Sequence, residues 1–245
     1  MSSLTKKVKT ERYTTKVNGR VMKNDRPKNT HIPTYPIKDE KDIKKIYRYL
    51  ELQIAYSKST FEEFIAYRNY MLFMLGINTA LRAEDLLQLK VKGVIKGRID
   101  TTENKTKKDQ HFMLNKKLFE EIKKYIEKFD LRLDDYLFAS RKSGDDGFTK
   151  PITRQASHKI MKTIAEVVGI NYSFGLHSLR KTFGYHYIKR NLNSADAWLT
   201  LSKMYNHSSP ATTMMYICWD DKDYKAREEF FLDNESTIKR NKRKK

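Results

Sequence analysis

Four side chains in the C-terminal part of the chain keep spacings that suit one active site: His177, Arg180, His207 and Tyr216. The first two stand three positions apart, the second histidine follows Arg180 by 27 positions, and the tyrosine follows that histidine by nine. Arginine binds anionic oxygens through a planar fork of donors, histidine transfers protons near neutral pH, and a tyrosine hydroxyl can act as a nucleophile. This combination favours acid–base or nucleophilic chemistry on an anionic group.

Helices are expected to position these side chains. The apolar residues around the HxxR pair recur with helical spacing, namely Leu176, Leu179, Phe183 and Tyr187. Both polar groups of the pair are therefore expected on one helix face. Further on, Ser208 or Ser209 can cap a short helix that has Pro210 at its first position. We expect this helix to carry Tyr216 back toward His207.

Each of these parts, taken alone, has a plainer structural explanation. An isolated HxxR pair is more often a surface or half-buried pair, and a tyrosine that ends an apolar helix is usually part of a core. The combination is more specific, because HxLR, HSS and TTxxY at these spacings resemble the C-terminal signature of the tyrosine recombinases. These are the phage-integrase family of DNA strand-exchange enzymes. The resemblance covers roughly residues 37–219.

The family also has an arginine far upstream, in a motif of the form ALRxxEL, and the segment TALRAEDLL supplies it. Arg82 takes the place of the first arginine, and Asp85 takes the place of its acidic companion. A family lysine lies on a β-hairpin further along, and Lys105 falls 23 residues after Arg82 in the loop ENKTKK. Lys107 and Lys108 lie close enough to remain alternatives to Lys105.

The resemblance implies a metal-free and cofactor-free cleavage of DNA. Tyr216 would attack the phosphorus and hold the 3′ phosphate as a phosphotyrosine, which conserves the bond energy for rejoining. Arg82 and Arg180 would bind the phosphate oxygens, and Lys105 would protonate the leaving 5′ oxygen.

The same resemblance assigns the remaining polar groups. His177 would be the base and His207 mainly a donor to the phosphate, while Asp85 would orient and balance the basic cluster without joining the chemistry. The reaction cycle would need two double-stranded DNA sites and a homo-tetramer, with accessory DNA-bending or directionality proteins as further partners. Integrase, invertase and resolvase activities all remain open.

Composition agrees with a nucleic-acid partner. The chain has 50 Lys and Arg against 30 Asp and Glu, a formal net charge of +20, which predicts salt-dependent attraction to a polyanion. An anionic membrane is the alternative, but the sequence has no distinct basic amphipathic anchor, and the apolar run at 71–75 is too short to span a bilayer. One cysteine and the absence of HxxxH or HExxH spacing argue against a disulfide or metal site. Without an apolar leader, we expect a cytoplasmic, nucleoid-associated protein.

The chain is expected to hold one catalytic domain of the mainly α class with a small antiparallel β-sheet (α+β), at residues 37–235. Residues 1–36 are rich in basic residues and poor in aliphatics, which predicts a flexible basic arm that either contacts DNA or aids solubility. A separate core-binding domain, common in the family, would not fit beside these parts. Residues 236–245 are expected to be a basic tail. Helices are expected at 39–56 with Asp39 as cap, at 60–76 with Thr60 as cap, at 118–129, and at 153–169 with Thr153 as cap. The sheet is expected at 91–114, and Arg82 on the turn after the second helix.

Two other classes of function share parts of this pattern. A type IB topoisomerase uses related chemistry, but its nucleophile motif usually lacks the HSSxxTT context. A DNA-binding protein with a disused site is the other alternative, and the intact set of Arg, Lys, HxxR, His and Tyr argues against it.

Overall fold

The computed structural model describes residues 13–17, 20–24, 34–105, 107–140 and 148–219. The chain forms two compact units, Met1–Phe183 and Gly184–Lys245. The boundary falls inside helix α6, which spans Leu176–Arg190. The predicted basic tail at 236–245 lies outside the described residues.

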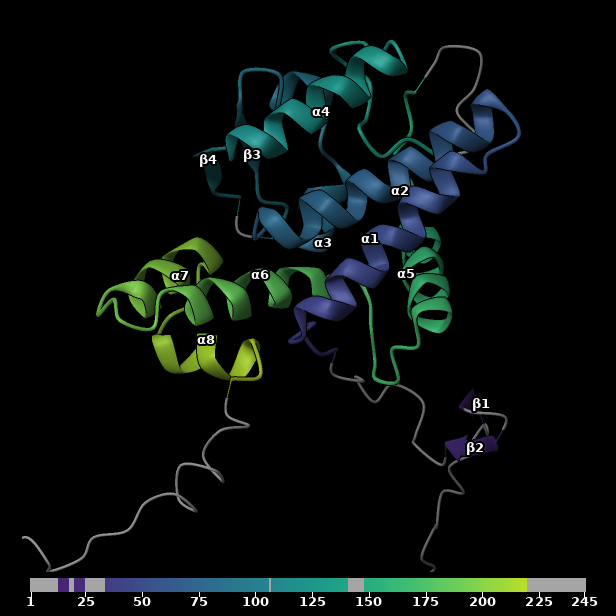
Figure 1. The fold of residues 1–245 in the computed structure, drawn as a ribbon. Helices are drawn as coiled ribbons and strands as arrows, with labels where there is room; N and C mark the ends of the chain where they lie inside the picture. Colours follow the sequence, from purple (N-terminus) through teal and green to yellow (C-terminus); the bar gives the residue numbers. More distant parts are fainter. Residues whose placement is uncertain (1–12, 18–19, 25–33, 106, 141–147, 220–245) are drawn as a thin grey trace, which may run out of the picture. The chain divides into compact units, whose positions relative to one another are not determined.

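Helices are the main regular elements among the described residues of both units (Figure 1). The first unit contains α1 (Glu40–Ala55), α2 (Thr60–Asn78), α3 (Ala83–Leu87), α4 (Lys116–Lys128), α5 (Arg154–Val168) and the 3-10 turn η1 (Val91–Gly93). The second unit contains α7 (Ala197–Tyr205) and α8 (Pro210–Tyr216), which pack against each other. Within the first unit, α1 packs on α2 and α5, and α2 packs on α4. The predicted mainly α class with a small antiparallel β-sheet is confirmed by these helices and by the antiparallel strands at residues 98–102 and 109–113.

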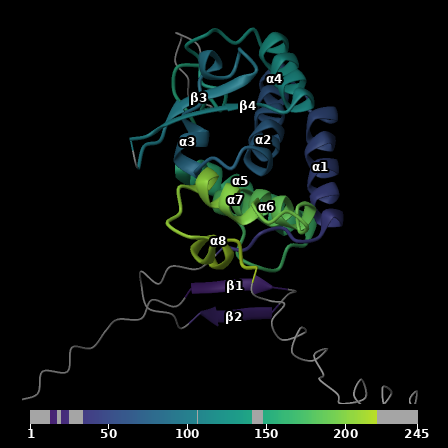
Figure 2. The same ribbon diagram turned by 90° about the vertical axis from the view of Figure 1, so that its left-hand side faces the viewer.

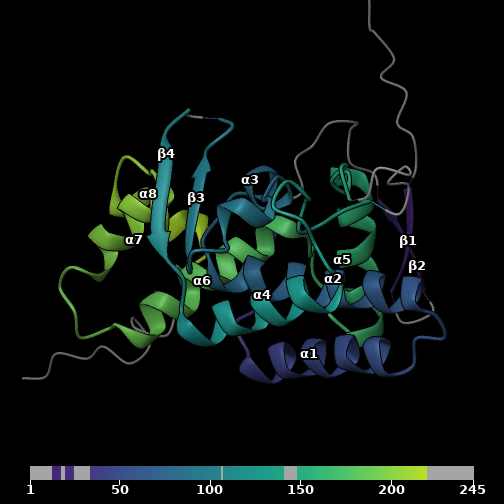
Figure 3. The same cartoon turned by 90° about the horizontal axis from the view of Figure 1, so that it is seen from above.

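Two antiparallel strand pairs complete the described structure. Strands β3 (Arg98–Thr102) and β4 (Asp109–Met113) pair from Arg98 opposite Met113 to Thr102 opposite Asp109, and Figure 3 shows them side by side. This hairpin was expected from the sequence.

Strands β1 (Tyr13–Val17) and β2 (Arg20–Asn24) form the other pair (Figure 2). They lie in the segment for which we predicted a flexible arm, so part of it forms regular structure. The Asn-Gly pair between the two strand sequences is a strong hairpin signal that the sequence analysis overlooked.

Most helix boundaries follow the caps expected from the sequence. Asp39 accepts a hydrogen bond from the Lys41 N–H at 2.8 Å and begins α1, as predicted. For α2 the predicted cap, Thr60, was wrong by one residue. Ser59 is the cap, because its extended backbone lets its hydroxyl accept from the Glu62 N–H at 3.2 Å.

The end of α2 lies against the start of α6 because residue 76 is glycine. A Cβ there would collide with the side chain of Leu179, which is fully buried. This close approach brings the α2–α3 turn next to the HxxR segment. No helix among the described residues is both long and apolar enough to cross a membrane.

Candidate active site

Arg82 lies on the turn between α2 and α3, as the sequence predicted. Helix α2 ends at Asn78, and Ala80 takes a left-handed conformation with φ of 58°. Such a backbone costs an L-residue on the order of 1 kcal/mol and persists where its surroundings hold it. Arg180 supplies one such restraint by donating a hydrogen bond from its guanidinium to the Ala80 carbonyl.

The HxxR pair lies on α6 as expected, with His177 in the first turn and Arg180 in the second. Ser178 stabilises the start of this helix, because its hydroxyl accepts from the Gly175 N–H at 3.1 Å. Arg180 is 3% exposed, whereas His177 is half-buried. The contact between Arg180 and Ala80 joins segments that lie 100 positions apart in the chain.

The loop that carries Lys105 is attached to the Arg82 segment through its neighbours. Glu103 is buried and forms an ion pair with Arg82, and it also accepts from the Gln110 side chain. The Asn104 N–H donates to the Asp85 carboxylate at 2.8 Å. Lys105 follows directly and its side chain is exposed.

Glu103 is a residue of this site that the sequence analysis missed. The only signal was its position two residues before Lys105, and exposed acidic residues are common in hairpin loops. Its burial depends on the ion pair with Arg82, a contact between segments about twenty positions apart that no local pattern encodes.

Asp85 is the carboxylate on which the basic groups converge. It is 2% exposed, and burial raises its pKa above the ordinary value of 3.8. The hydrogen bond from Asn104 opposes this rise, the charge of Glu103 adds to it, and the charges of Arg82 and Arg180 oppose it. The Oδ2 atom has no hydrogen-bond partner among the described residues. Both arginines therefore lie close enough to act on one buried carboxylate.

This raised pKa predicts how Asp85 affects stability. Because the folded state disfavours the charged carboxylate, its contribution is most favourable below pH 3.8 and is lost as pH rises through the folded pKa. We expect Asp85→Asn to gain stability relative to the wild type as pH increases, measured by urea unfolding of both proteins at several pH values. If Asp85→Asn instead loses stability relative to the wild type as pH rises, the charges of Arg82 and Arg180 lower the pKa of Asp85 more than burial raises it.

The second unit holds His207 and Tyr216. Of the two candidate caps for α8, Ser209 is the one used, since its hydroxyl accepts from the Thr212 N–H at 3.2 Å. Pro210 is at the first helical position, as predicted. The rings of His207 and Tyr216 lie 5.1 Å apart between centroids and meet edge to face. Helix α8 thus returns the tyrosine to the histidine.

A third ring completes this cluster. The buried Tyr205 lies 5.2 Å from the His207 ring and 5.4 Å from the Tyr216 ring. Gly184 permits this packing, because a Cβ there would overlap the Tyr205 hydroxyl and the Ile217 side chain. The helical spacing of apolar residues in the sequence did not indicate that residue 184 must be glycine.

The predicted catalytic residues thus fall into two groups. Arg82, Asp85, Lys105, His177 and Arg180 belong to the first unit, and His207 and Tyr216 belong to the second. In the first unit, hydrogen bonds and charges join the α2–α3 turn, the β3–β4 loop and α6. In the second, the histidine and the tyrosine are in ring contact.

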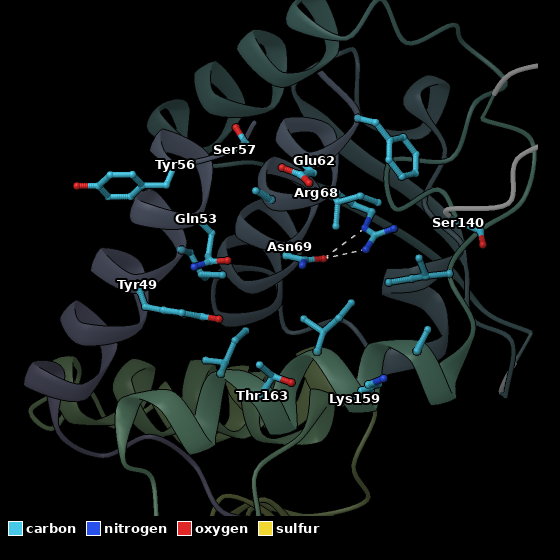
Figure 4. A pocket seen from close by; sticks show the side chains of 18 residues that line it. Tyr49, Gln53, Tyr56, Ser57, Glu62, Arg68, Asn69, Ser140, Lys159 and Thr163 are labelled. Atoms are coloured by element: carbon cyan, nitrogen blue, oxygen red, sulfur yellow. Dashed lines mark hydrogen bonds between the residues drawn. The ribbon is translucent and has the colours of Figure 1, made fainter. Parts of the chain in front are cut away.

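A cavity of about 700 Å³ lies elsewhere in the first unit, between α1, α2 and α5 (Figure 4). None of the predicted catalytic residues lines it. Its buried Arg68 donates to the Asn69 side chain at 3.0 Å and to the Ala139 carbonyl at 2.8 Å. The contact with Ala139 holds α2 to the segment before residue 141.

Comparisons with known proteins agree with the motifs. The model of the phage integrase family matches residues 39–222. A probable integrase/recombinase of Bacillus subtilis, YoeC, is 39% identical over 67% of this chain and 84% of its own length. A tyrosine recombinase of Pseudothermotoga lettingae is 26% identical over 61% of this chain and 49% of that protein.

Two solved structures are similar in fold. One is the XerH site-specific recombinase in a post-cleavage complex with its palindromic difH substrate. Its TM-score is 0.60 at 21% identity, and the match covers 82% of this chain and 54% of the XerH chain. The XerA recombinase gives a TM-score of 0.58 at 18% identity, over 83% of this chain and 68% of its own. The chain thus spans only about half the length of the XerH protein.

Proposed function

Because the chain belongs to the phage integrase family, we propose that it is a site-specific recombinase that cleaves and rejoins double-stranded DNA through a 3′-phosphotyrosyl intermediate. The observation that supports this most is the convergence of Arg82 and Arg180 on the buried Asp85. Two forked guanidinium groups beside one carboxylate suit the non-bridging oxygens of a phosphodiester, with the carboxylate limiting their mutual repulsion.

In the proposed cleavage, every bond and proton is accounted for without an added cofactor. The Tyr216 oxygen attacks phosphorus, the bond from phosphorus to the 5′ oxygen breaks, and the ammonium of Lys105 protonates that leaving oxygen. Tyrosine ordinarily titrates near pH ~10, so a base must take its proton, and His177 is assigned to this step by family resemblance. Attack by a 5′ hydroxyl on the phosphotyrosine reverses these steps and joins the new strand.

Lys105 is preferred over Lys107 and Lys108 because of its neighbours. The Asn104 N–H, one residue before it, binds Asp85, and Glu103, two residues before it, pairs with Arg82. This attachment supports a position for Lys105 beside the arginines. All three lysines are exposed, so exposure does not distinguish them.

Lys105→Ala is expected to cleave ordinary DNA slowly and to recover on a substrate whose leaving 5′ oxygen is replaced by sulfur. A thiolate departs without a proton, so a missing general acid no longer limits the step. The measurement is the single-turnover rate of adduct formation on both substrates. Lys107→Ala is the matched control and should behave like the wild type on each. Equal defects of Lys105→Ala on the two substrates would contradict its assignment.

The partners follow from the same proposal. The net charge of +20 supports binding to double-stranded DNA with strong salt dependence. By analogy with the family, four protomers would act on two synapsed sites in the cytoplasm, at the nucleoid. Accessory bending or directionality proteins would then select integration, excision or inversion.

The test of the proposed function is incubation with nicked or supercoiled DNA that carries candidate sites, followed by denaturing electrophoresis. The expected result is a protein band shifted by covalently attached DNA at particular sites. Relaxation of supercoils without site preference would instead favour a type IB topoisomerase. Binding without an adduct or relaxation would indicate a DNA-binding protein with a disused site.

A further inference from the structure

A series of hydrogen bonds through two buried hydroxyl groups connects His207 to the backbone of α7. The His207 Nδ1 atom lies 3.0 Å from the Thr213 Oγ1, which lies 2.8 Å from the Ser202 Oγ. The Ser202 hydroxyl in turn donates to the Trp198 carbonyl at 2.7 Å. Thr213 is fully buried and Ser202 is 5% exposed, so water does not compete for these contacts.

Counting the protons in this series fixes the direction of each hydrogen bond from His207 to the Trp198 carbonyl. The Trp198 carbonyl can only accept, so Ser202 uses its single proton there. Ser202 must then accept from Thr213, whose proton is also used. A second acceptor for that proton, the Ser209 carbonyl, is more distant at 3.4 Å. In either case Thr213 has no proton left for the imidazole, so Nδ1 of His207 must be the donor.

The opposite direction would place two acceptors in contact. If Thr213 donated to Nδ1, either the 2.8 Å contact between Thr213 and Ser202 or the 2.7 Å contact between Ser202 and the Trp198 carbonyl would lack a proton. An unmade hydrogen bond between buried polar groups is a net loss, because neither group can bond to water instead. The arrangement in which each of the three contacts from His207 to the Trp198 carbonyl holds one proton therefore dominates.

We propose that Thr213 and Ser202 are positioning residues that hold His207 as the tautomer with its proton on Nδ1. This inference rests on the proposed function for its consequence, but the tautomer itself does not depend on it. With Nδ1 protonated in both charge states, Nε2 is the nitrogen that gains and loses a proton. His207 then donates to a DNA phosphate only as the imidazolium, and in its neutral form Nε2 accepts.

This tautomer extends the function assigned to His207 by resemblance. A histidine that serves only as a donor would keep its proton on Nε2 when neutral, whereas the Thr213 contact gives the reverse. Nε2 can therefore also receive a proton in the reaction, beside the nucleophile whose ring is 5.1 Å away. Contact with the buried Tyr205 ring limits reorientation of the imidazole.

The two adjacent threonines offer a matched pair of variants. Thr213 bonds to the histidine, whereas the Thr212 hydroxyl pairs with the Ser209 hydroxyl at 3.0 Å at the start of the same helix. Valine has nearly the shape of threonine and lacks the hydroxyl. Thr213→Val removes the acceptor for Nδ1–H, and Thr212→Val makes the same change one position away.

The test is ¹⁵N NMR of the imidazole nitrogens in the full-length protein, at a pH where the histidine is neutral. The His207 signals are assigned by their loss in His207→Asn. We expect the wild type, Thr212→Val and Thr213→Ser to show the Nδ1–H tautomer, and Thr213→Val to show a shift toward Nε2–H. A wild-type His207 that is mainly Nε2–H would overturn the proposal directly, even if Thr213→Val failed to fold. An unchanged tautomer in folded Thr213→Val would also overturn it.

A kinetic measurement connects the tautomer to the reaction. We expect Thr213→Val to slow single-turnover adduct formation about tenfold at unchanged DNA affinity, while Thr213→Ser restores the rate. If the wild type forms no adduct but shows the Nδ1–H tautomer, the proposed function fails and the positioning contact stands. If the wild type forms the adduct and its tautomer is Nε2–H, the proposed function stands and the positioning proposal fails.

Discussion

Tyr216→Phe is expected to abolish the covalent protein–DNA adduct while leaving DNA affinity unchanged. The phenylalanine ring can keep the edge contacts with His207 and Tyr205, at 5.1 and 5.4 Å between centroids, but the attacking oxygen is gone. The measurements are denaturing electrophoresis for the adduct and a gel shift at matched salt for affinity, because phosphate contacts dominate binding.

The matched control for this variant is Tyr187→Phe, which removes a hydroxyl from a half-buried tyrosine on α6. It should form the adduct at the wild-type rate. An adduct formed by Tyr216→Phe would place the nucleophile elsewhere, and Tyr187 and Tyr205 would be the next residues to test. Loss of the adduct in both variants would point to a general effect on the fold, which thermal unfolding of each protein would reveal.

Arg180→Lys is expected to lower the single-turnover cleavage rate about a hundredfold, which corresponds to roughly 3 kcal/mol of transition-state stabilisation. Lysine keeps the positive charge near Asp85 but has no planar fork, so its single nitrogen cannot reproduce the separate, fixed donors that the guanidinium offers to the Ala80 carbonyl and to a phosphate oxygen. Pre-steady-state quench measurements at saturating DNA separate this loss from weaker binding.

Arg190→Lys provides the comparison, since Arg190 is exposed at the end of the same helix and the substitution has the same chemistry. We expect its cleavage rate to equal that of the wild type. A cleavage rate for Arg180→Lys close to the wild-type rate would show that charge alone, and not forked geometry, is sufficient at this position. A large fall in thermal stability would assign the effect to the lost bond with Ala80.

Local sequence determined most of the helices and the identity of the candidate residues. Caps such as Asp39 and Thr153, followed by helical apolar spacing, act within one or two turns, and both begin helices as predicted. The placement of Arg82 on a turn and of the HxxR pair on α6 followed from the same short-range patterns. These features could be predicted because their causes lie within a few residues of their effects.

The sequence was less informative where two local signals compete in the same segment. The cap of α2 is Ser59 and not Thr60, since adjacent hydroxyl residues both suit the motif and backbone geometry selects between them. The strands β1 and β2 were missed because an abundance of basic residues outweighed a hairpin signal in the same segment.

Tertiary structure alone decided which groups share an environment. The ion pair of Glu103 with Arg82, the bond from Arg180 to Ala80 and the contact of Thr213 with Ser202 each join different elements. The raised pKa of Asp85 and the proton position on His207 follow from such contacts and from burial, neither of which is a property of a short segment. Residue types limited the chemistry that this chain can perform, whereas the folded contacts set the direction of each hydrogen bond, because donors and acceptors are matched only after distant segments meet.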